Sequence, residues 1–105
     1  MADEIVAFRF RYGGLAVDRG LKPDLLALGK LIGGGLPIGA LVGRPDVMAE
    51  LDPAGPSGLE HGGTFSANPV VMEAGVVALD LLDEPTIERM NQLGDQARRQ
   101  LGNEI

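Results

Sequence analysis

The stretch "DLLALGKLIGGGLPIGA", residues 24–40, places one lysine inside an apolar run and follows it with three consecutive glycines. The apolar residues before Lys30 form a run of strand length, and a second short apolar run follows Pro37. Glycine and proline break regular structure between the two runs. We therefore predict two short strands, at residues 25–30 and 37–42, joined by a glycine-rich turn.

Outside this stretch, the N-terminal "DEIVAFRF" is rich in β-branched and aromatic residues, which predicts a strand at residues 3–8. The glycine- and proline-punctuated residues 11–24 favour a loop. Strands come first along the chain and helices last, and no linker separates two domains, so we predict a single domain.

Three helices are predicted in the second half of the chain, at residues 45–51, 69–82 and 86–101. The first has Pro45 in its first turn, and the second begins with an Asn cap followed by proline, both common at helix starts. Residues 69–82 are apolar on most sides, so we expect that helix to be largely buried. The last is amphipathic.

Composition narrows the function classes. The chain has 105 residues, of which 45% are hydrophobic, and a net charge of −6, which disfavours nucleic acid and anionic membranes as partners. It contains no cysteine and one histidine, His61, so we predict no disulfide and no metal site. The acidic N-terminus carries no signal peptide, and no apolar run reaches membrane-spanning length. We expect a cytoplasmic protein.

Lys30 is the first candidate for chemistry. Lys22 and Lys30 are the only lysines, and only Lys30 has apolar neighbours on both sides. A lysine amine is nucleophilic when neutral, and apolar surroundings favour the neutral form, which suits Schiff-base chemistry. The alternative is a lysine whose charged end reaches water from a strand end.

Two further patterns carry polar groups. Asp3 and Glu4 adjoin the first predicted strand, where one carboxylate can support a protonated ring nitrogen or act as a base and the other can make a salt bridge. A solvated acidic terminus is the alternative. In "HGGTFSANP", residues 61–69, Gly63 and Thr64 offer backbone N–H groups and a hydroxyl just ahead of a helix start, as in a phosphate cradle. The alternative is an ordinary glycine turn.

A carboxylate, an amine and an anion cradle are the three groups that a pyridoxal phosphate site requires. The segments "DEIVAFRFRYGG", "PDLLALGKLIGGGLPIGALVGRPDVM" and "HGGTFSANPVVMEAG" together resemble the class III aminotransferases of fold type I. The branch that they resemble most is glutamate-1-semialdehyde 2,1-aminomutase, and the resemblance covers residues 2–105. It implies an α/β fold, in which the chain is part of the large domain of a fold type I PLP-dependent transferase.

The resemblance also implies roles for particular residues. Asp3 matches the aspartate that pairs with the pyridine nitrogen of pyridoxal 5′-phosphate, and Ile5 matches the apolar residue that packs on the ring. Lys30 matches the Schiff-base lysine that later moves the substrate's α-proton. Thr64, beside Gly63, matches the threonine that binds the cofactor phosphate across a homodimer interface. The implied reaction is transamination, or intramolecular amino transfer on a five-carbon skeleton, with a small amino acid, amino-aldehyde or keto compound as substrate.

Members of this family are roughly four times as long as the present chain. We therefore expect residues 1–105 to be a fragment of the major domain, without the upstream half and the C-terminal small domain. An alternative is a catalytically inactive fragment that acts only by packing or self-association. A third, weaker hypothesis is a general binder of phosphate esters that uses Gly62–Thr64.

Overall fold

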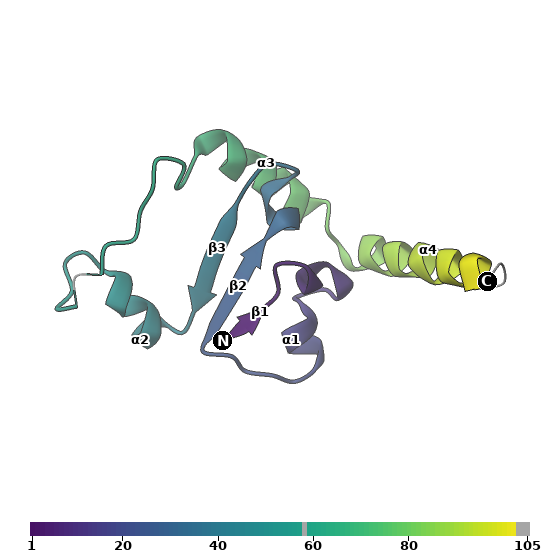
Figure 1. The fold of residues 1–105 in the computed structure, drawn as a ribbon, viewed down its shortest axis with the longest axis horizontal. Coiled ribbons are helices and arrows are strands. Elements are labelled where there is room, and N and C mark those ends of the chain that lie inside the picture. Colours follow the sequence, from purple (N-terminus) through teal and green to yellow (C-terminus); the bar gives the residue numbers. More distant parts are fainter. Residues whose placement is uncertain (58, 103–105) are drawn as a thin grey trace.

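The computed structural model describes residues 1–57 and 59–102, and its centre is a three-stranded sheet (Figure 1). The strands are β1 (Ala2–Asp3), β2 (Leu25–Gly29) and β3 (Gly39–Gly43), in the spatial order β1-β2-β3. β1 runs parallel to β2, and β3 runs antiparallel to it. The α/β class and the strands at 25–30 and 37–42 are confirmed, with small differences at their ends.

The connection between β2 and β3 is compact because glycines allow backbone shapes that other residues avoid. It consists of the 3₁₀ helix η2 (Lys30–Gly33) and a turn in which Gly34 and Gly35 both have positive φ. The β2–β3 pairing then runs from Gly29 opposite Gly39 to Leu25 opposite Gly43. This turn therefore fixes the register of the hairpin.

The predicted strand at residues 3–8 is wrong beyond Asp3. The Ile5 N–H donates to Asp3 Oδ1 at 2.9 Å, which turns the chain out of the sheet. The Phe8 N–H then bonds to the Glu4 carbonyl at 3.1 Å, and the 3₁₀ helix η1 (Ala7–Phe10) follows. The loop predicted at 11–24 contains one further short helix, α1 (Leu15–Asp18).

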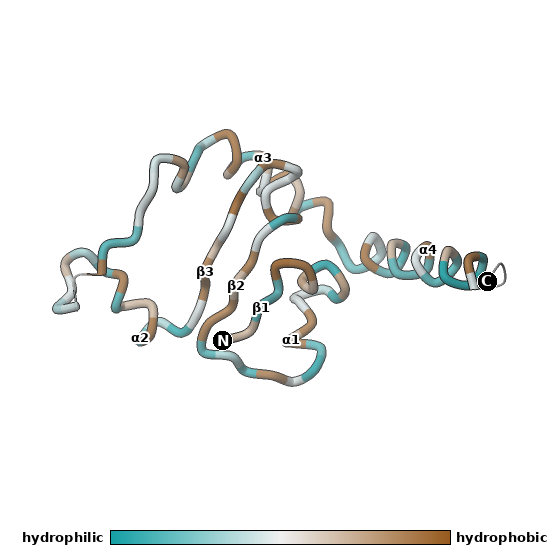
Figure 2. The backbone as a smooth tube through the Cα atoms, viewed as in Figure 1, coloured by the Kyte–Doolittle hydropathy of each residue, from teal (hydrophilic) through white to brown (hydrophobic). Residues whose placement is uncertain are grey.

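The helices of the second half lie close to their predicted positions. They are α2 (Pro45–Met48), continued by the 3₁₀ helix η3 (Ala49–Leu51), then α3 (Pro69–Asp80) and α4 (Glu84–Gly102). Asn68 caps α3, since its Oδ1 accepts the N–H groups of Val70 at 3.0 Å and Val71 at 3.3 Å. Figure 2 shows hydrophilic and hydrophobic residues alternating along α4, as predicted for an amphipathic helix.

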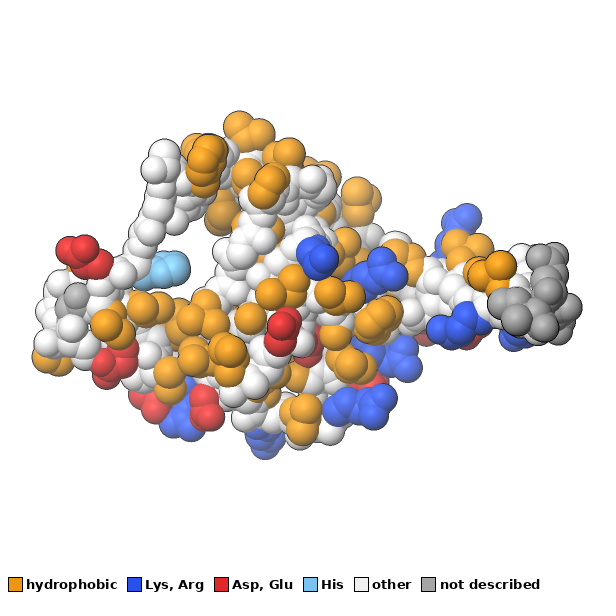
Figure 3. Space-filling view, in the orientation of Figure 1, with side chains coloured by type: hydrophobic (Ala, Val, Ile, Leu, Met, Phe, Trp, Pro, Cys, Tyr) orange, Lys and Arg blue, Asp and Glu red, His pale blue; other side chains and the backbone are white. Residues whose placement is uncertain are grey.

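The expectation that α3 is largely buried is wrong for this chain. One side of α3 packs against η2 through the buried Gly75, and most of its other large apolar side chains are exposed because no other described element covers them. Hydrophobic side chains gather over α3 in the space-filling view (Figure 3). The exposed large side chains of this region are Val70, Met72, Val76, Val77, Leu79 and Leu81. Among residues 1–57 and 59–102 the buried hydrophobic side chains are few: Ala16, Ile32, Leu82 and Ile87.

We expect α4 to lose helix content in acid because Asp83 caps it. Hydrogen bonding from Thr86, through its side chain and then its backbone N–H, lowers the pKa of Asp83 below its ordinary value. A lowered pKa in the folded state means that the cap stabilises the helix above about pH 4 and is lost as the pH falls further. Far-ultraviolet circular dichroism across an acid titration measures this, and Asp83→Asn, which keeps a capping oxygen without titrating, should flatten the transition. An unchanged transition in this variant would contradict the prediction.

Within the described residues, no helix is long and apolar enough to span a membrane.

Candidate active site

The parallel pairing of β1 with β2 brings Asp3 and Lys30 to the same edge of the sheet. Asp3 is the last residue of β1 and pairs with Ala27, while Lys30 directly follows the last residue of β2. Lys30 therefore lies three residues, or about 10 Å, beyond the level of Asp3 along the neighbouring strand. The carboxyl ends of parallel strands are where α/β proteins place their ligands.

Lys30 has an unusual backbone conformation, with φ of 51° in the left-handed region. Such a φ is uncommon for a residue with a side chain and costs about 1–2 kcal/mol. Its neighbours hold it there, because Gly29 is buried in the sheet and both Ile32 and Gly33 are buried in η2. Residues kept in this region against their preference cluster at functional sites.

The apolar neighbours of Lys30 in the sequence do not bury it, and its side chain is exposed where the chain leaves the sheet. Lys30 lines two cavities. The smaller, of about 190 Å³, is formed by Ile5, Val6, Phe8, Arg9, Lys30 and Leu31. The larger, of about 730 Å³, is formed by Lys30, Leu31, Gly34, Gly35, Leu36, Pro37 and Ala78. The structure thus brings Ile5 and Lys30 to one cavity.

Asp3 is exposed, and its side chain shapes the turn that follows it. Its Oδ1 accepts the Ile5 N–H, which leaves Oδ2 for another donor. The turn sets the Ile5 side chain against Gly29, where a Cβ added to Gly29 would lie 3.3 Å from Ile5 Cγ2. The ends of β1 and β2 therefore carry Asp3, Ile5 and Lys30 at one edge of the sheet.

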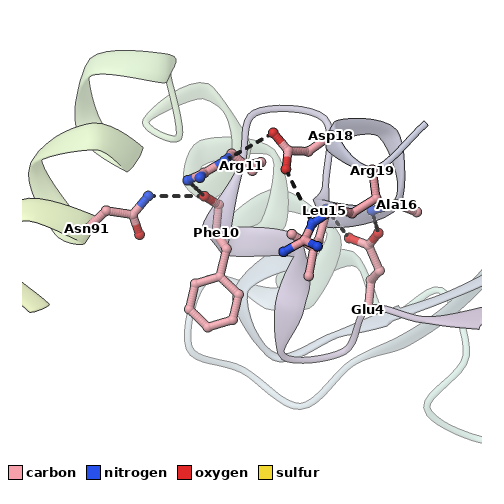
Figure 4. Close-up of polar contacts among 8 residues, drawn as sticks. All are labelled: Glu4, Phe10, Arg11, Leu15, Ala16, Asp18, Arg19 and Asn91. Atoms are coloured by element: carbon pink, nitrogen blue, oxygen red, sulfur yellow. Dashed lines mark hydrogen bonds and ion pairs between the residues drawn. The ribbon is translucent and has the colours of Figure 1, made fainter. Parts of the chain in front are cut away.

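Glu4, unlike Asp3, is buried. Among the described residues it does not form the salt bridge that was considered from the sequence. It is 3% exposed, and its carboxylate accepts the N–H groups of Leu15, at 2.9 Å, and Ala16 at the start of α1 (Figure 4). This function was not foreseen, because the hydrogen-bond partners lie eleven and twelve residues away in a segment predicted to be a loop. A buried structural carboxylate and an exposed one thus stand side by side.

Gly63 and Thr64 line a groove of about 950 Å³, formed with β3 and α3. Its lining does not include Lys30 or Asp3, but it shares Pro37 and Phe8 with the two Lys30 cavities. The first N–H groups of α3 are taken by Asn68, so an anion at this loop would bind the loop's own backbone and the Thr64 hydroxyl. His61 is exposed in the same loop. In the described part of the chain, no cluster of His, Asp or Glu has the form of a metal site.

Comparison with known proteins places the chain in a family. The pattern that defines "Aminotransferase class-III" matches residues 1–104, so the chain belongs to the class III aminotransferase family. An uncharacterized aminotransferase of Schizosaccharomyces pombe is 45% identical over 100 residues, which are 94% of this chain and 23% of that protein.

Solved structures agree with the family. An omega-transaminase from Sphaerobacter thermophilus superimposes with a TM-score of 0.85 at 47% identity, over 92% of this chain and 22% of that protein. A transaminase with PLP bound gives the same TM-score of 0.85 at 42% identity, over 91% of this chain and 23% of that one. The chain spans about a quarter of the length of these relatives.

Proposed function

We propose that this protein takes part in PLP-dependent amino transfer, with Lys30 as the Schiff-base lysine. The observation that carries the proposal is the placement of Asp3 and Lys30 at the carboxyl ends of two adjacent parallel strands, with Ile5 and Lys30 on one cavity. Membership of the class III aminotransferase family supports it, as does the similarity to a transaminase with PLP bound.

The chemistry of the donor set fits this cofactor. Asp3 offers a free carboxylate oxygen to a protonated ring nitrogen, Ile5 offers an apolar surface to a flat ring, and Lys30 offers an amine to an aldehyde. When bound, pyridoxal 5′-phosphate supplies an electron sink that stabilises negative charge at the substrate α-carbon. Asp3 would hold the ring nitrogen in its protonated form. The Lys30 amine would anchor the aldehyde and, as a free amine, would take and return the substrate's α-proton.

Gly63 and Thr64 are proposed to bind the cofactor phosphate of a second copy of the chain. Neither residue lines the Lys30 cavities, so we infer that the phosphate contact comes from a second copy of the chain. The sequence resemblance, which implies a homodimer, supports this arrangement. Residues 1–105 would then form part of the major domain of such a transferase.

Thr64→Val tests the phosphate role. Loss of a hydrogen bond to a charged group costs about 1.5–3 kcal/mol, so we expect the affinity for pyridoxal 5′-phosphate to fall roughly 10- to 100-fold. Affinity for pyridoxal, which lacks the phosphate, should stay the same. Spectrophotometric titration with both compounds measures the two affinities. An equal loss for both would show that Thr64 acts on something other than the phosphate.

The substrates proposed are a small amino donor and a carbonyl acceptor. The sequence resemblance to glutamate-1-semialdehyde 2,1-aminomutase favours intramolecular transfer, in which both carbons belong to one five-carbon skeleton. Half-reactions with glutamate-1-semialdehyde and with ordinary amino acids compare the two cases. Faster loss of the bound-cofactor absorbance with the semialdehyde supports the aminomutase, and faster loss with an amino acid supports a transaminase.

Labelling of the lysines tests the proposal as a whole. The chain is mixed with pyridoxal 5′-phosphate, reduced with borohydride, and digested for mass spectrometry, which is simple because there are only two lysines. We expect the label on Lys30 and not on Lys22. Equal labelling of both lysines would overturn the proposal.

A catalytically inactive packing module is the second candidate, and the exposed apolar side chains of α3 favour it. It predicts no label on Lys30, together with a sedimentation coefficient that rises with concentration.

A further inference from the structure

We propose that Glu4 is a positioning residue, which fixes the turn carrying Asp3 and Ile5 by joining the end of β1 to the start of α1. The inference rests on the proposed function, which gives Asp3 and Ile5 their roles. Glu4 itself would touch neither cofactor nor substrate. Its backbone N–H donates to the Ala27 carbonyl at 2.9 Å, so it extends the β1–β2 pairing by one residue.

The carboxylates of Glu4 and Asp3 have different partners. That of Glu4 is bonded to the start of α1, whereas Asp3 Oδ1 accepts the Ile5 N–H. Both oxygens of Glu4 are used, since Oε2 accepts the Leu15 N–H and Oε1 accepts the Ala16 N–H (Figure 4). A charge that is 3% exposed is costly unless it is hydrogen-bonded in this way.

A side chain at Gly14 would displace this carboxylate from its hydrogen bonds. Gly14, the residue before α1, has φ of 94°, and a Cβ added there would lie 2.5 Å from Glu4 Oε2. Gly13 has a similar φ of 81°, but a Cβ added there would meet nothing within 4 Å. Both glycines therefore have positive φ, but only a side chain at Gly14 would meet Glu4.

Three attachments consequently hold residues 3–5. The Ala27 carbonyl holds the Glu4 backbone, the start of α1 holds the Glu4 carboxylate, and Asp3 Oδ1 holds the Ile5 N–H. None of them uses Asp3 Oδ2. The arrangement orients Asp3 while it leaves one oxygen free for a ligand.

The test compares Gly14→Ala with Gly13→Ala, and adds Glu4→Gln, which keeps the shape of the side chain. Both alanines occupy a left-handed position, but only the one at Gly14 meets the carboxylate. Amide hydrogen exchange of the chain without cofactor is measured at Leu15, Ala16 and Ile5. We expect exchange at all three amides to be at least 10-fold faster in Gly14→Ala and Glu4→Gln than in Gly13→Ala.

The Ile5 amide decides between positioning and simple helix capping, because it reports the Asp3 turn and does not touch α1. Faster exchange at Leu15 and Ala16, with Ile5 unchanged, would overturn the proposal. A second measurement uses the chain loaded with pyridoxal 5′-phosphate, in which visible circular dichroism reports how firmly the ring is oriented. We expect this signal to fall at least threefold in Glu4→Gln and to persist in Gly13→Ala.

The two proposals fail in different ways. If the unmodified chain takes no label on Lys30, the proposed function fails, while the exchange at Ile5 still decides whether Glu4 fixes the turn. If the label forms and the circular dichroism of Glu4→Gln equals that of Gly13→Ala, the positioning role fails and the proposed function stands.

Discussion

Lys30→Ala is expected to abolish the borohydride-stable attachment of pyridoxal 5′-phosphate and to lower its affinity at least 100-fold. The reason is that Lys30 is the lysine at the ends of β1 and β2 and on the same cavity as Ile5. The covalent bond requires a neutral amine, so Lys30→Arg should fail equally, because arginine stays protonated in proteins. Absorbance titration followed by mass spectrometry of the reduced chain measures both effects.

Lys22→Ala is the matched control. Lys22 is exposed in the segment between α1 and β2, so its removal should leave attachment unchanged. Lys30→Gly separates chemistry from backbone strain, since it too lacks the amine but relieves the positive φ. We expect Lys30→Gly to be about 1 kcal/mol more stable than Lys30→Ala in urea unfolding. Attachment that survives in Lys30→Ala would refute the assignment of this lysine.

Gly75→Ala is expected to lower the free energy of unfolding by about 3 kcal/mol. A Cβ at this position would be driven into the backbone carbonyl of Ile32, where α3 packs against η2. Backbone atoms cannot move aside as a flexible side chain does, so the contact behaves as an overpacked core. Because η2 begins at Lys30, the same substitution should also displace the candidate active site.

Gly94→Ala in α4 is the control for this prediction. Gly94 is also a helical glycine, but a Cβ there meets nothing within 4 Å, so alanine should stabilise the chain by about 0.5–1 kcal/mol. Urea unfolding followed by circular dichroism gives both free energies. If the two substitutions change the free energy of unfolding equally, Gly75 is not needed for the close packing of α3 on η2, and the prediction is wrong.

The elements that could be predicted from the sequence are those with strong local signals. The apolar run before Lys30 and the Asn68-Pro69 start of α3 were identified correctly, because each signal lies within the element that it specifies. The strand at residues 3–8 was predicted too long, since its side chains favour extended structure while a hydrogen bond to Asp3 turns the backbone.

The residues of the candidate site also differ in whether a local sequence signal identifies them. Lys30 and Asp3 were identified from residue type and resemblance, and the parallel pairing of β1 with β2 explains how they come to share an edge. Their roles remain predictions, as do those of Ile5, Gly63 and Thr64. The hydrogen bonding of Glu4 to the start of α1 was not predicted, because it depends on a distant turn with positive φ. The exposure of α3 was not predicted either, because it depends on which elements cover that helix.

The position of β3 has a practical consequence. Within the described residues β3 pairs with β2 alone, so the backbone groups of its outer edge have no strand beside them. Leu41 and Val42 are exposed on this strand, and edge strands of this kind add further strands readily. Work with the isolated chain should therefore begin at low protein concentration, and thioflavin fluorescence should be monitored, because irregular strand addition at this edge would mimic ordered self-association.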